Sequence, residues 1–423
     1  MTVHVVGAGL AGLAAAAHLA AEGQRVSLYE AAPQAGGRCR SYHDKTLGRV
    51  IDNGNHLMLS GNRDLFGYLE RIGAASSLVG PNEARFPFVD LRTGERWAVR
   101  IEGGRWTTFL NDPTRGVPGA RLPGRIKGLR LPFVGKDETV AGCLQKTGVL
   151  WERFWEPMAV AVLNTPPKRA SAQLLWKAMR ESFVRGQTAC RPLVAKKSLA
   201  ASLVDPGLAF LTRHHADLYF GQRLRLIDLS RRAEALHFAS LQVTLGPSDQ
   251  VILALPPALI ADLLPDIPAP TAAHAILNAH FRLSAPVRQP DRSKLQGLIG
   301  GQAQWLFFRD DIVSVTVSAA DQLVEETADA IAGVLWLDVA KAMDLPTDPI
   351  PPFRVIKEKR ATFSQTPAAN QQRPPTRTGW PNLHLAGDWT DTGLPATIEG
   401  AVRSGHLAAQ AVLDDLTIGR AGP

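Results

Sequence analysis

Short apolar runs and one Ala-rich run alternate over the first thirty residues, and this pattern predicts strand, helix, strand. Residues 3–7 are apolar enough for a buried strand, and 13–22 have the composition of a helix. Residues 24–29 form the second apolar run, which Glu30 ends. A βαβ order of this kind predicts a parallel sheet with its helix packed on one face.

Apolar spacing further along the chain predicts a second group of elements. Alternating positions over 84–110 indicate strands of a mixed or antiparallel sheet. The spacing over 151–163 is helical, and Pro157 predicts a kink or a new helix start. We also expect helices over 171–185, 196–203, 258–265 and 321–341, and strands over 218–220, 224–227, 241–245, 275–283, 304–308 and 312–318.

Two later segments have the pattern of strands that join the N-terminal sheet. Residues 251–255 are a continuous apolar run ended by two prolines, which is typical of a strand buried on both faces. Residues 383–388 predict a strand, and a helix with small residues follows over 398–412. We therefore expect an α/β protein with a Rossmann-like domain and a second α+β domain on a mixed sheet. The Rossmann-like domain comprises 1–82, 205–266 and 373–423, and the second domain comprises 83–204 and 267–372.

Gly7, Gly9 and Gly12 lie between the first strand and its helix at a spacing that binds dinucleotides. Gly7 allows the tight turn, Gly9 lets a pyrophosphate approach, and Gly12 lets the helix pack closely. The helix start at Leu10 and Ala11 offers free N–H groups and a positive dipole end to phosphate. The alternative is a glycine-rich turn in some other α/β fold.

Two features after the second strand extend this site. Glu30 can accept two hydroxyls of an adenosine ribose and would repel a 2′-phosphate, and the adjacent Ala31 belongs to the same predicted contact. Gly36-Gly37-Arg38 is a second phosphate device, in which the arginine pairs with pyrophosphate charge. NAD-only dehydrogenases do not need this second loop, although a plain turn with a solvated arginine has the same residues.

The segment 52–61 is small, polar and glycine-bearing, which suits backbone that runs beside a flat ring. Gly54, Asn55 and His56 of this segment are expected to contact the cofactor. His56 is a candidate proton donor, and the equal alternative is a structural hydrogen bond.

The C-terminal strand and helix also point to the cofactor. Gly387 and Asp388 end the strand, where Asp388 can accept hydrogen bonds from a polyol chain. The helix start, with Thr397, Ile398 and Ala401, can stabilise negative charge on a reduced ring. An ordinary αβ packing unit is the alternative.

Composition narrows the partners. The 423 residues carry 47 basic and 39 acidic side chains, a net charge of +8, without a nucleic-acid-binding motif. We expect no nucleic acid, and the charge indicates either an anionic membrane surface or a merely basic exterior. The basic, apolar segment 112–135 likewise either touches a membrane, covers an entrance or is a surface loop.

Three distant cysteines, Cys39, Cys143 and Cys190, have no metal-binding spacing and predict no disulfide framework. Together with the lack of a signal peptide, they favour a cytoplasmic location. No apolar run reaches the ~18 residues that a bilayer span needs. Any membrane contact is therefore expected to be peripheral, at the inner face of the cytoplasmic membrane.

These motifs resemble the flavin amine oxidase and phytoene desaturase superfamily. Several segments resemble, more closely, the squalene-associated FAD-dependent desaturases of hopanoid synthesis: GRCRSY at 37–42, DNGNHL at 52–57, LNTPP at 163–167, EKRATF at 358–363 and the stretch 386–401. The resemblance implies a glutathione-reductase-type FAD domain and reduction of hydroxysqualene to squalene by FADH2. The sequence departs from the family at one position. Members of the wider superfamily usually place a valine against the adenine, whereas the equivalent region of this chain is Leu229-Ser230, which leaves that contact open.

The implied substrate is a long apolar allylic alcohol whose cation must be shielded from water. His56 is the first proton-donor candidate, followed by Asp391 and Glu399. An apolar tunnel is expected from residues 151–163 and 304–318. The sequence has no second GxGxxG unit, so a separate flavin reductase or free NAD(P)H is the expected electron source.

Three alternatives remain at this point. The first is a carotenoid or phytoene-type desaturase, which runs the flavin in the other direction. The second is a flavin amine oxidase. The third is a prenyl-binding escort protein that shares the fold without using flavin.

Overall fold

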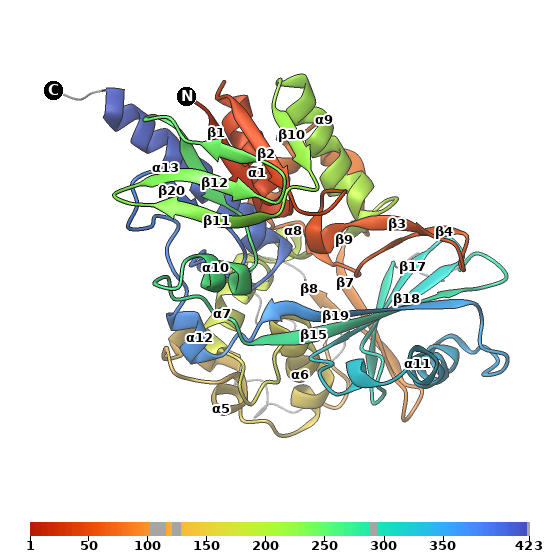
Figure 1. Cartoon of the computed structure of the whole chain (residues 1–423). Coiled ribbons are helices and arrows are strands. Elements are labelled where there is room, and N and C mark those ends of the chain that lie inside the picture. The colour runs from red at the N-terminus through yellow and green to blue at the C-terminus, as the bar shows by residue number, and fades with distance from the viewer. Residues whose placement is uncertain (102–115, 121–127, 288–293, 421–423) are drawn as a thin grey trace.

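A computed structural model describes residues 1–101, 116–120, 128–287 and 294–420. Two large sheets form its framework, a parallel sheet and a mixed sheet, and each is built from segments far apart in sequence (Figure 1). The chain termini lie at the same end of the molecule, beside the parallel sheet.

The parallel sheet has the strand order β10-β2-β1-β14-β20, and all its neighbours are parallel. Its strands are β1 (Val3–Val6), β2 (Val26–Glu30), β10 (Asp217–Phe220), β14 (Gln250–Leu253) and β20 (Leu383–Leu385). Every residue of β1, β14 and β20 is buried, which explains why these strands are mostly apolar, with one polar residue in each: His4, Gln250 and His384. The three segments expected to share this sheet therefore do so.

Two long helices from opposite ends of the chain cover one face of this sheet. They are α1 (Leu10–Ala21) and α13 (Ile398–Arg420), with α2 (Arg63–Arg71) and α9 (Asp205–Arg213) packed beside them. Small residues allow a very close approach: a Cβ on Gly405 would lie 2.2 Å from the carbonyl oxygen of Ala11. Gly405 therefore sets the spacing between α1 and α13.

The mixed sheet has the order β19-β15-β18-β17-β16-β7-β8, and only the β16–β7 pair is parallel. Its strands are β7 (Ala84–Asp90), β8 (Arg96–Ile101), β15 (Ala273–Arg282), β16 (Leu295–Ile299), β17 (Trp305–Arg309), β18 (Ile312–Ser318) and β19 (Phe353–Phe363). Helix α11 (Ala328–Met343) shares a core with one face, and a helical group shares a core with the other. That group is α5 (Val140–Leu144), the π-helical turn Trp151–Trp155, α6 (Glu156–Leu163), α7 (Ala172–Glu181) and α8 (Gln187–Cys190).

Smaller elements fill the space around the two sheets. The antiparallel sheet β11 (Leu224–Leu229), β12 (Ala233–Phe238) and β13 (Gln242–Thr244) shares a core with the parallel sheet. The remaining elements are β3 (Ser41–Asp44), β4 (Arg49–Asp52), β5 (Met58–Leu59), β6 (Leu78–Val79), β9 (Pro192–Ala195), α10 (Pro257–Leu263) and α12 (Pro367–Gln371), besides several 3-10 turns and a π-helical turn at Ala200–Val204.

Most expected elements are present, with shifted ends. Pro157 lies directly after the π-helical turn, inside a continuous helical run over residues 149–163, so the alternative of a new helix start is wrong and the irregularity near Pro157 is the π-helical turn. The helix expected over 196–203 begins later and continues through α9. Residues 112–115 and 121–127 of the basic segment, and 102–110 of the expected strand region, lie outside the described residues.

We predict opposite effects for two glycine-to-alanine substitutions in helices. Gly405→Ala should lower the free energy of unfolding by about 1–3 kcal/mol, because its methyl group would strike the α1 backbone. Gly67→Ala in α2 has no atom within 4 Å of the new methyl and should raise it by roughly 0.5–1 kcal/mol. Urea unfolding of both variants measures this, and equal effects would contradict the proposed α1–α13 spacing.

Candidate active site

The first glycine turn lies at the carboxyl edge of the parallel sheet, between β1 and α1. Gly7 has φ +105°, and a Cβ on Gly12 would lie only 1.8 Å from the carbonyl oxygen of Gly7. A Cβ on Gly9 would meet no atom within 4 Å, so the space above the turn is open. The N–H groups of the first α1 turn have no acceptor within the helix and face this edge. The turn therefore fits a diphosphate.

The second glycine turn packs directly on the first. Gly36 donates its N–H to the carbonyl oxygen of Ala8 at 2.8 Å and has φ +107°. Gly37 has φ +53°, and a Cβ there would lie 3.4 Å from the Cα of Gly9. Two turns separated by a helix and a strand in sequence thus form one cradle.

Glu30 lies at the end of β2, as expected from the sequence. Its Oε2 accepts the N–H of Ala8 at 2.8 Å, and its Oε1 accepts the N–H of Ala32 at 2.9 Å, while Ala31 is exposed beside it. A carboxylate has about four acceptor sites, so two stay available for ribose hydroxyls.

The chain next to Glu30 is the start of β11 rather than its end. Gln222 donates its N–H to the Glu30 carbonyl oxygen at 2.8 Å, and β11 begins at Leu224. Leu229 and Ser230, the region where the resemblance left the adenine contact uncertain, therefore lie at the far end of β11 from Glu30.

An ion pair joins the N-terminal and C-terminal parts of the site. Arg38 Nη2 lies 2.8 Å from Oδ2 of Asp388, whose side chain is 8% exposed. The Asp388 carboxylate raises the pKa of Arg38. Gly387 donates its N–H to the Ser404 hydroxyl at 2.8 Å, which ties the end of β20 to α13.

Thr397 begins α13 and caps it. Its hydroxyl accepts the N–H of Gly400 at 3.1 Å, and its carbonyl accepts the N–H of Ala401 at 2.9 Å. The N–H groups of Ile398 and Glu399 lie in the first turn, where the dipole is positive. This helix end faces the same edge of the sheet as the glycine turns.

Neither of the secondary proton-donor candidates faces the site. Glu399 accepts the N–H groups of Asp64 and Leu65 at 3.0 and 2.9 Å, at the start of α2. Asp391 is exposed and accepts the N–H of Gly393. Their sequence position near the strand end suggested an active-site role, but their side chains turn to α2 and to the exterior.

Asn55 and His56 line a cavity of about 270 Å³ beside the cradle, together with Phe307, Phe308 and Arg309. Burial and the nearby Arg38 lower the pKa of His56 to about 4, so its imidazole is neutral at pH 7. Asp52, which is 2% exposed, pairs with Arg309 in the cavity wall. Of the two stretches expected to line an apolar tunnel, 304–318 contributes to this cavity, whereas 151–163 packs in the helical core.

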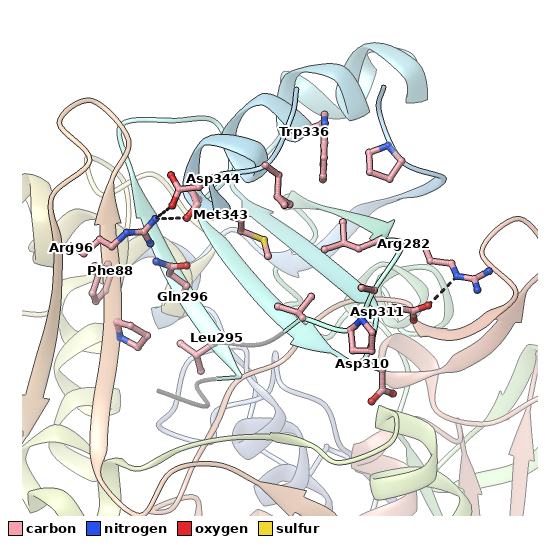
Figure 2. A pocket seen from close by; sticks show the side chains of 18 of the residues that line it. Phe88, Arg96, Arg282, Leu295, Gln296, Asp310, Asp311, Trp336, Met343 and Asp344 are labelled. Atoms are coloured by element: carbon pink, nitrogen blue, oxygen red, sulfur yellow. Dashed lines mark hydrogen bonds and ion pairs between the residues drawn. The ribbon is translucent and has the colours of Figure 1, made fainter. Parts of the chain in front are cut away.

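A much larger groove, of about 1870 Å³, lies on the α11 side of the mixed sheet, where Trp336 and Met343 line it (Figure 2). The smaller cavity lies on the opposite side of this sheet, and Asp310, in the turn between β17 and β18, lines both. Its apolar lining includes Phe88, Trp97, Leu283, Leu295, Met343 and Leu345. Charges at its edge are largely paired, as in the 3.4 Å contact between Arg96 and Asp344 and the contacts of Asp311. The groove therefore offers apolar surface and shares Asp310 with the cavity that Asn55 and His56 line.

Sequence reasoning missed several polar residues of the mixed sheet. Asn278 and His280 on β15 and Ser314 and Thr316 on β18 reach toward residues 52–55. The available signal was the strict alternation of polar and apolar residues over 312–318. That pattern shows which residues share a face but not what the face contacts.

Among the described residues, no group of three or more His, Cys, Asp or Glu side chains can hold a metal ion. Cys39, Cys143 and Cys190 are buried and unpaired. No helix in the described part of the chain is long and apolar enough to cross a bilayer.

Comparison with known proteins identifies the class. The family model of flavin-containing amine oxidoreductases matches residues 10–413, and the chain belongs to this family. FAD is its cofactor, and it is an oxidoreductase with the fold expected from the sequence. Solved structures with this fold include a putative protoporphyrinogen oxidase from Exiguobacterium sp. (TM-score 0.70, 17% identity, 98% of this chain and 99% of that chain) and cyclohexylamine oxidase from Brevibacterium oxydans (TM-score 0.71, 16% identity, 98% and 99%).

Curated relatives are more similar in sequence. Hydroxysqualene dehydroxylase of Sinorhizobium fredii is 44% identical over 416 residues, covering 98% of each chain. The protein of the same name from Rhodopseudomonas palustris is 44% identical, covering 97% of this chain and 98% of that protein. A 15-cis-phytoene desaturase of Glycine max is 22% identical, covering 98% and 80%.

We predict that Arg38→Ala weakens FAD binding by roughly tenfold, because it removes the cation that joins the second glycine turn to Asp388. Arg40→Ala is the matched control, since Arg40 is on the same loop and donates only to the carbonyl of Gly37. FAD titration of both variants measures the effect. Equal FAD affinities of the Arg38→Ala and Arg40→Ala variants would show that Arg38 does not contribute to cofactor binding.

A pH-dependent contribution to stability should come from Glu399. Burial raises its pKa from 4.5 to about 7, although the N–H groups of Asp64 and Leu65 oppose the shift. Because the folded pKa exceeds the unfolded one, this contribution is present below pH 4.5 and is lost as the pH rises to 7. The difference in unfolding free energy between wild type and Glu399→Gln should therefore change over this range. A difference independent of pH would show that folding does not raise the pKa of Glu399.

Proposed function

We propose that this protein reduces hydroxysqualene to squalene, in squalene and hopanoid synthesis. The observation that carries the proposal is the 44% identity to hydroxysqualene dehydroxylases over 98% of the chain. The cavity at Asn55 and His56, next to a diphosphate cradle, supports it, because an apolar alcohol needs a protected site beside the cofactor.

In the reaction, the allylic C–O bond breaks, a new C–H bond forms at carbon, and the hydroxyl takes up a proton and leaves as water. When bound, FADH2 supplies the hydride and becomes FAD. The protein has to shield the allylic cation and help the hydroxyl to leave. His56 is the proposed catalytic residue. Its imidazole is neutral at pH 7, so it assists the departing oxygen as an N–H hydrogen-bond donor and not as a cation.

We propose that the FAD contacts are the residues predicted from the sequence. This set is supported by the meeting of four chain segments, 7–12, 30–38, 54–56 and 387–401, at the carboxyl edge of the parallel sheet. It comprises Gly7, Gly9, Leu10, Ala11, Gly12, Glu30, Ala31, Gly36, Gly37, Arg38, Gly54, Asn55, His56, Gly387, Asp388, Thr397, Ile398 and Ala401. The division 1–82, 205–266 and 373–423 for the FAD domain is supported by the parallel sheet, which takes all its strands from these segments. The substrate domain then comprises 83–204 and 267–372.

The substrate chain extends, in this proposal, from the small cavity into the adjoining groove. The cavity of about 270 Å³ is smaller than common ligand pockets, which measure roughly 300–1,000 Å³. The groove has the missing volume and shares Asp310 with the cavity.

Ala98→Trp would narrow this groove from β8, and we predict that it raises KM for hydroxysqualene at least about fivefold, with little change for a short allylic alcohol. Ala239→Trp, at an exposed site beyond β12, is the control. Steady-state kinetics with both alcohols measure the effect. Equal changes for the two alcohols would place the long chain elsewhere.

Electrons are proposed to come from a separate flavin reductase or NAD(P)H. The protein is proposed to act in the cytoplasm, in peripheral contact with an anionic membrane that supplies the apolar substrate. The net charge of +8 supports this contact.

The direct test is an anaerobic single turnover of the FADH2-loaded protein with hydroxysqualene. We expect squalene to form in step with flavin reoxidation. Reoxidation without squalene would reject the reaction. Desaturation of phytoene would favour the carotenoid desaturase alternative, amine-dependent peroxide the amine oxidase alternative, and a colourless purified protein the escort alternative.

A further inference from the structure

Polar side chains on β15 and β18 form a buried ladder on one face of the mixed sheet. Asn278 lies opposite Thr316, and His280 lies opposite Ser314. The Thr316 hydroxyl donates to Oδ1 of Asn278 at 2.8 Å, and Nδ1 of His280 lies 2.7 Å from the Ser314 hydroxyl. All four residues are at most 8% exposed. Buried polar groups are costly to bury and persist when every partner is supplied.

Side chains of the ladder form hydrogen bonds with the backbone of residues 52–55, which directly precede His56. His280 Nε2 donates to the carbonyl oxygen of Asp52 at 3.1 Å, and Asn278 Nδ2 donates to the carbonyl oxygen of Asn53 at 3.4 Å. Asn278 Oδ1 accepts the backbone N–H of Asn55 at 3.3 Å. Because a backbone N–H can only donate, this last bond fixes which way the Asn278 amide faces.

That orientation determines the orientation of the Asn55 side chain. Its Nδ2 donates to Asn278 Oδ1 at 3.3 Å and to Thr316 Oγ1 at 3.1 Å, and these two acceptors, 2.8 Å apart, share one N–H of the amide. The side-chain carbonyl oxygen of Asn55 accepts no hydrogen bond from the described residues, and Asn55 lines the cavity beside His56. Gly54 makes room for this arrangement, since a Cβ there would lie 3.2 Å from Asn278 Nδ2 and 3.8 Å from His56 Nε2.

We infer that Asn278 and Thr316 are positioning residues that hold the Asn55 carbonyl oxygen toward the cavity, where it accepts the O–H of the allylic alcohol. This inference rests on the proposed function. The hydroxyl then donates to Asn55 and keeps its lone pairs for the N–H of His56. Asn55 thereby discriminates the alcohol from a hydrocarbon, which has no proton to donate.

The experiment compares binding of hydroxysqualene and squalene to the FAD-loaded protein. Squalene is the natural reference because it lacks only the hydroxyl. In Asn55→Ala, the ratio of Kd for hydroxysqualene to Kd for squalene should rise roughly three- to tenfold, with both values measured on protein that is saturated with FAD. Thr316→Val should reproduce the effect, and Thr316→Ser, which keeps the hydroxyl, should restore wild-type binding.

Asn382→Ala is the matched control for a buried asparagine. Asn382 is 3% exposed and bonds to the backbone of Ala233 and Asp249, at the amino ends of the parallel strands. It should lower the unfolding temperature without changing the ratio of the two Kd values. A ratio that stays at the wild-type value in Asn55→Ala and Thr316→Val, or no rescue by Thr316→Ser, would overturn the inference. Failure of the wild-type protein to convert hydroxysqualene would instead reject the proposed function.

Discussion

The close contact between α1 and α13 is the constraint on which the rest of the site depends. Gly405 of α13 lies against the backbone of Ala11 and Ala15, so the first and last helices approach more closely than ordinary side chains allow. Because each helix begins at the carboxyl edge of the same sheet, this contact brings the two helix N-termini to one place. Two positive dipole ends and two glycine turns then surround one volume.

The segment from Asp52 to His56 joins this cofactor site to the mixed sheet. Its backbone is held by Asn278 and His280, and Asp52 pairs with Arg309 at the end of β17. The side chains in these contacts are buried, so the loss of one partner would leave a buried polar group without a hydrogen bond. The mixed sheet thus fixes the backbone that carries Asn55 and His56, while the parallel sheet carries the glycine turns.

Local features of the fold could be predicted from the sequence, because they are encoded within a few residues. The βαβ unit, its three glycines, Glu30 and the helix irregularity near Pro157 all follow from short-range spacing. The shared sheet of β1, β14 and β20 could be anticipated because strands buried on both faces are mostly apolar, and each of these strands has a single polar residue. The parallel pairing of β16 with β7 gave no such signal, since it depends on contacts between distant segments.

Side-chain direction is the part that sequence could not supply. Glu399 and Asp391 flank the correct strand and helix, yet one turns to α2 and the other to the exterior. Asn278 looks like an ordinary polar residue in a strand, and only the register with Thr316 and the approach of Asn55 reveal its position. The sequence likewise did not show that β11 begins beside Glu30 and ends at Leu229, because the direction of a strand depends on its tertiary neighbours.

Hydrogen–deuterium exchange of the FAD-free and FAD-loaded protein tests the central claim that both chain ends close on one cofactor. We expect FAD to slow amide exchange together in residues 7–13, 36–41, 52–57 and 387–401, which meet at the edge of the parallel sheet. Slower exchange in the three segments 7–13, 36–41 and 52–57 alone, with 387–401 unaffected by saturating FAD, would contradict the account.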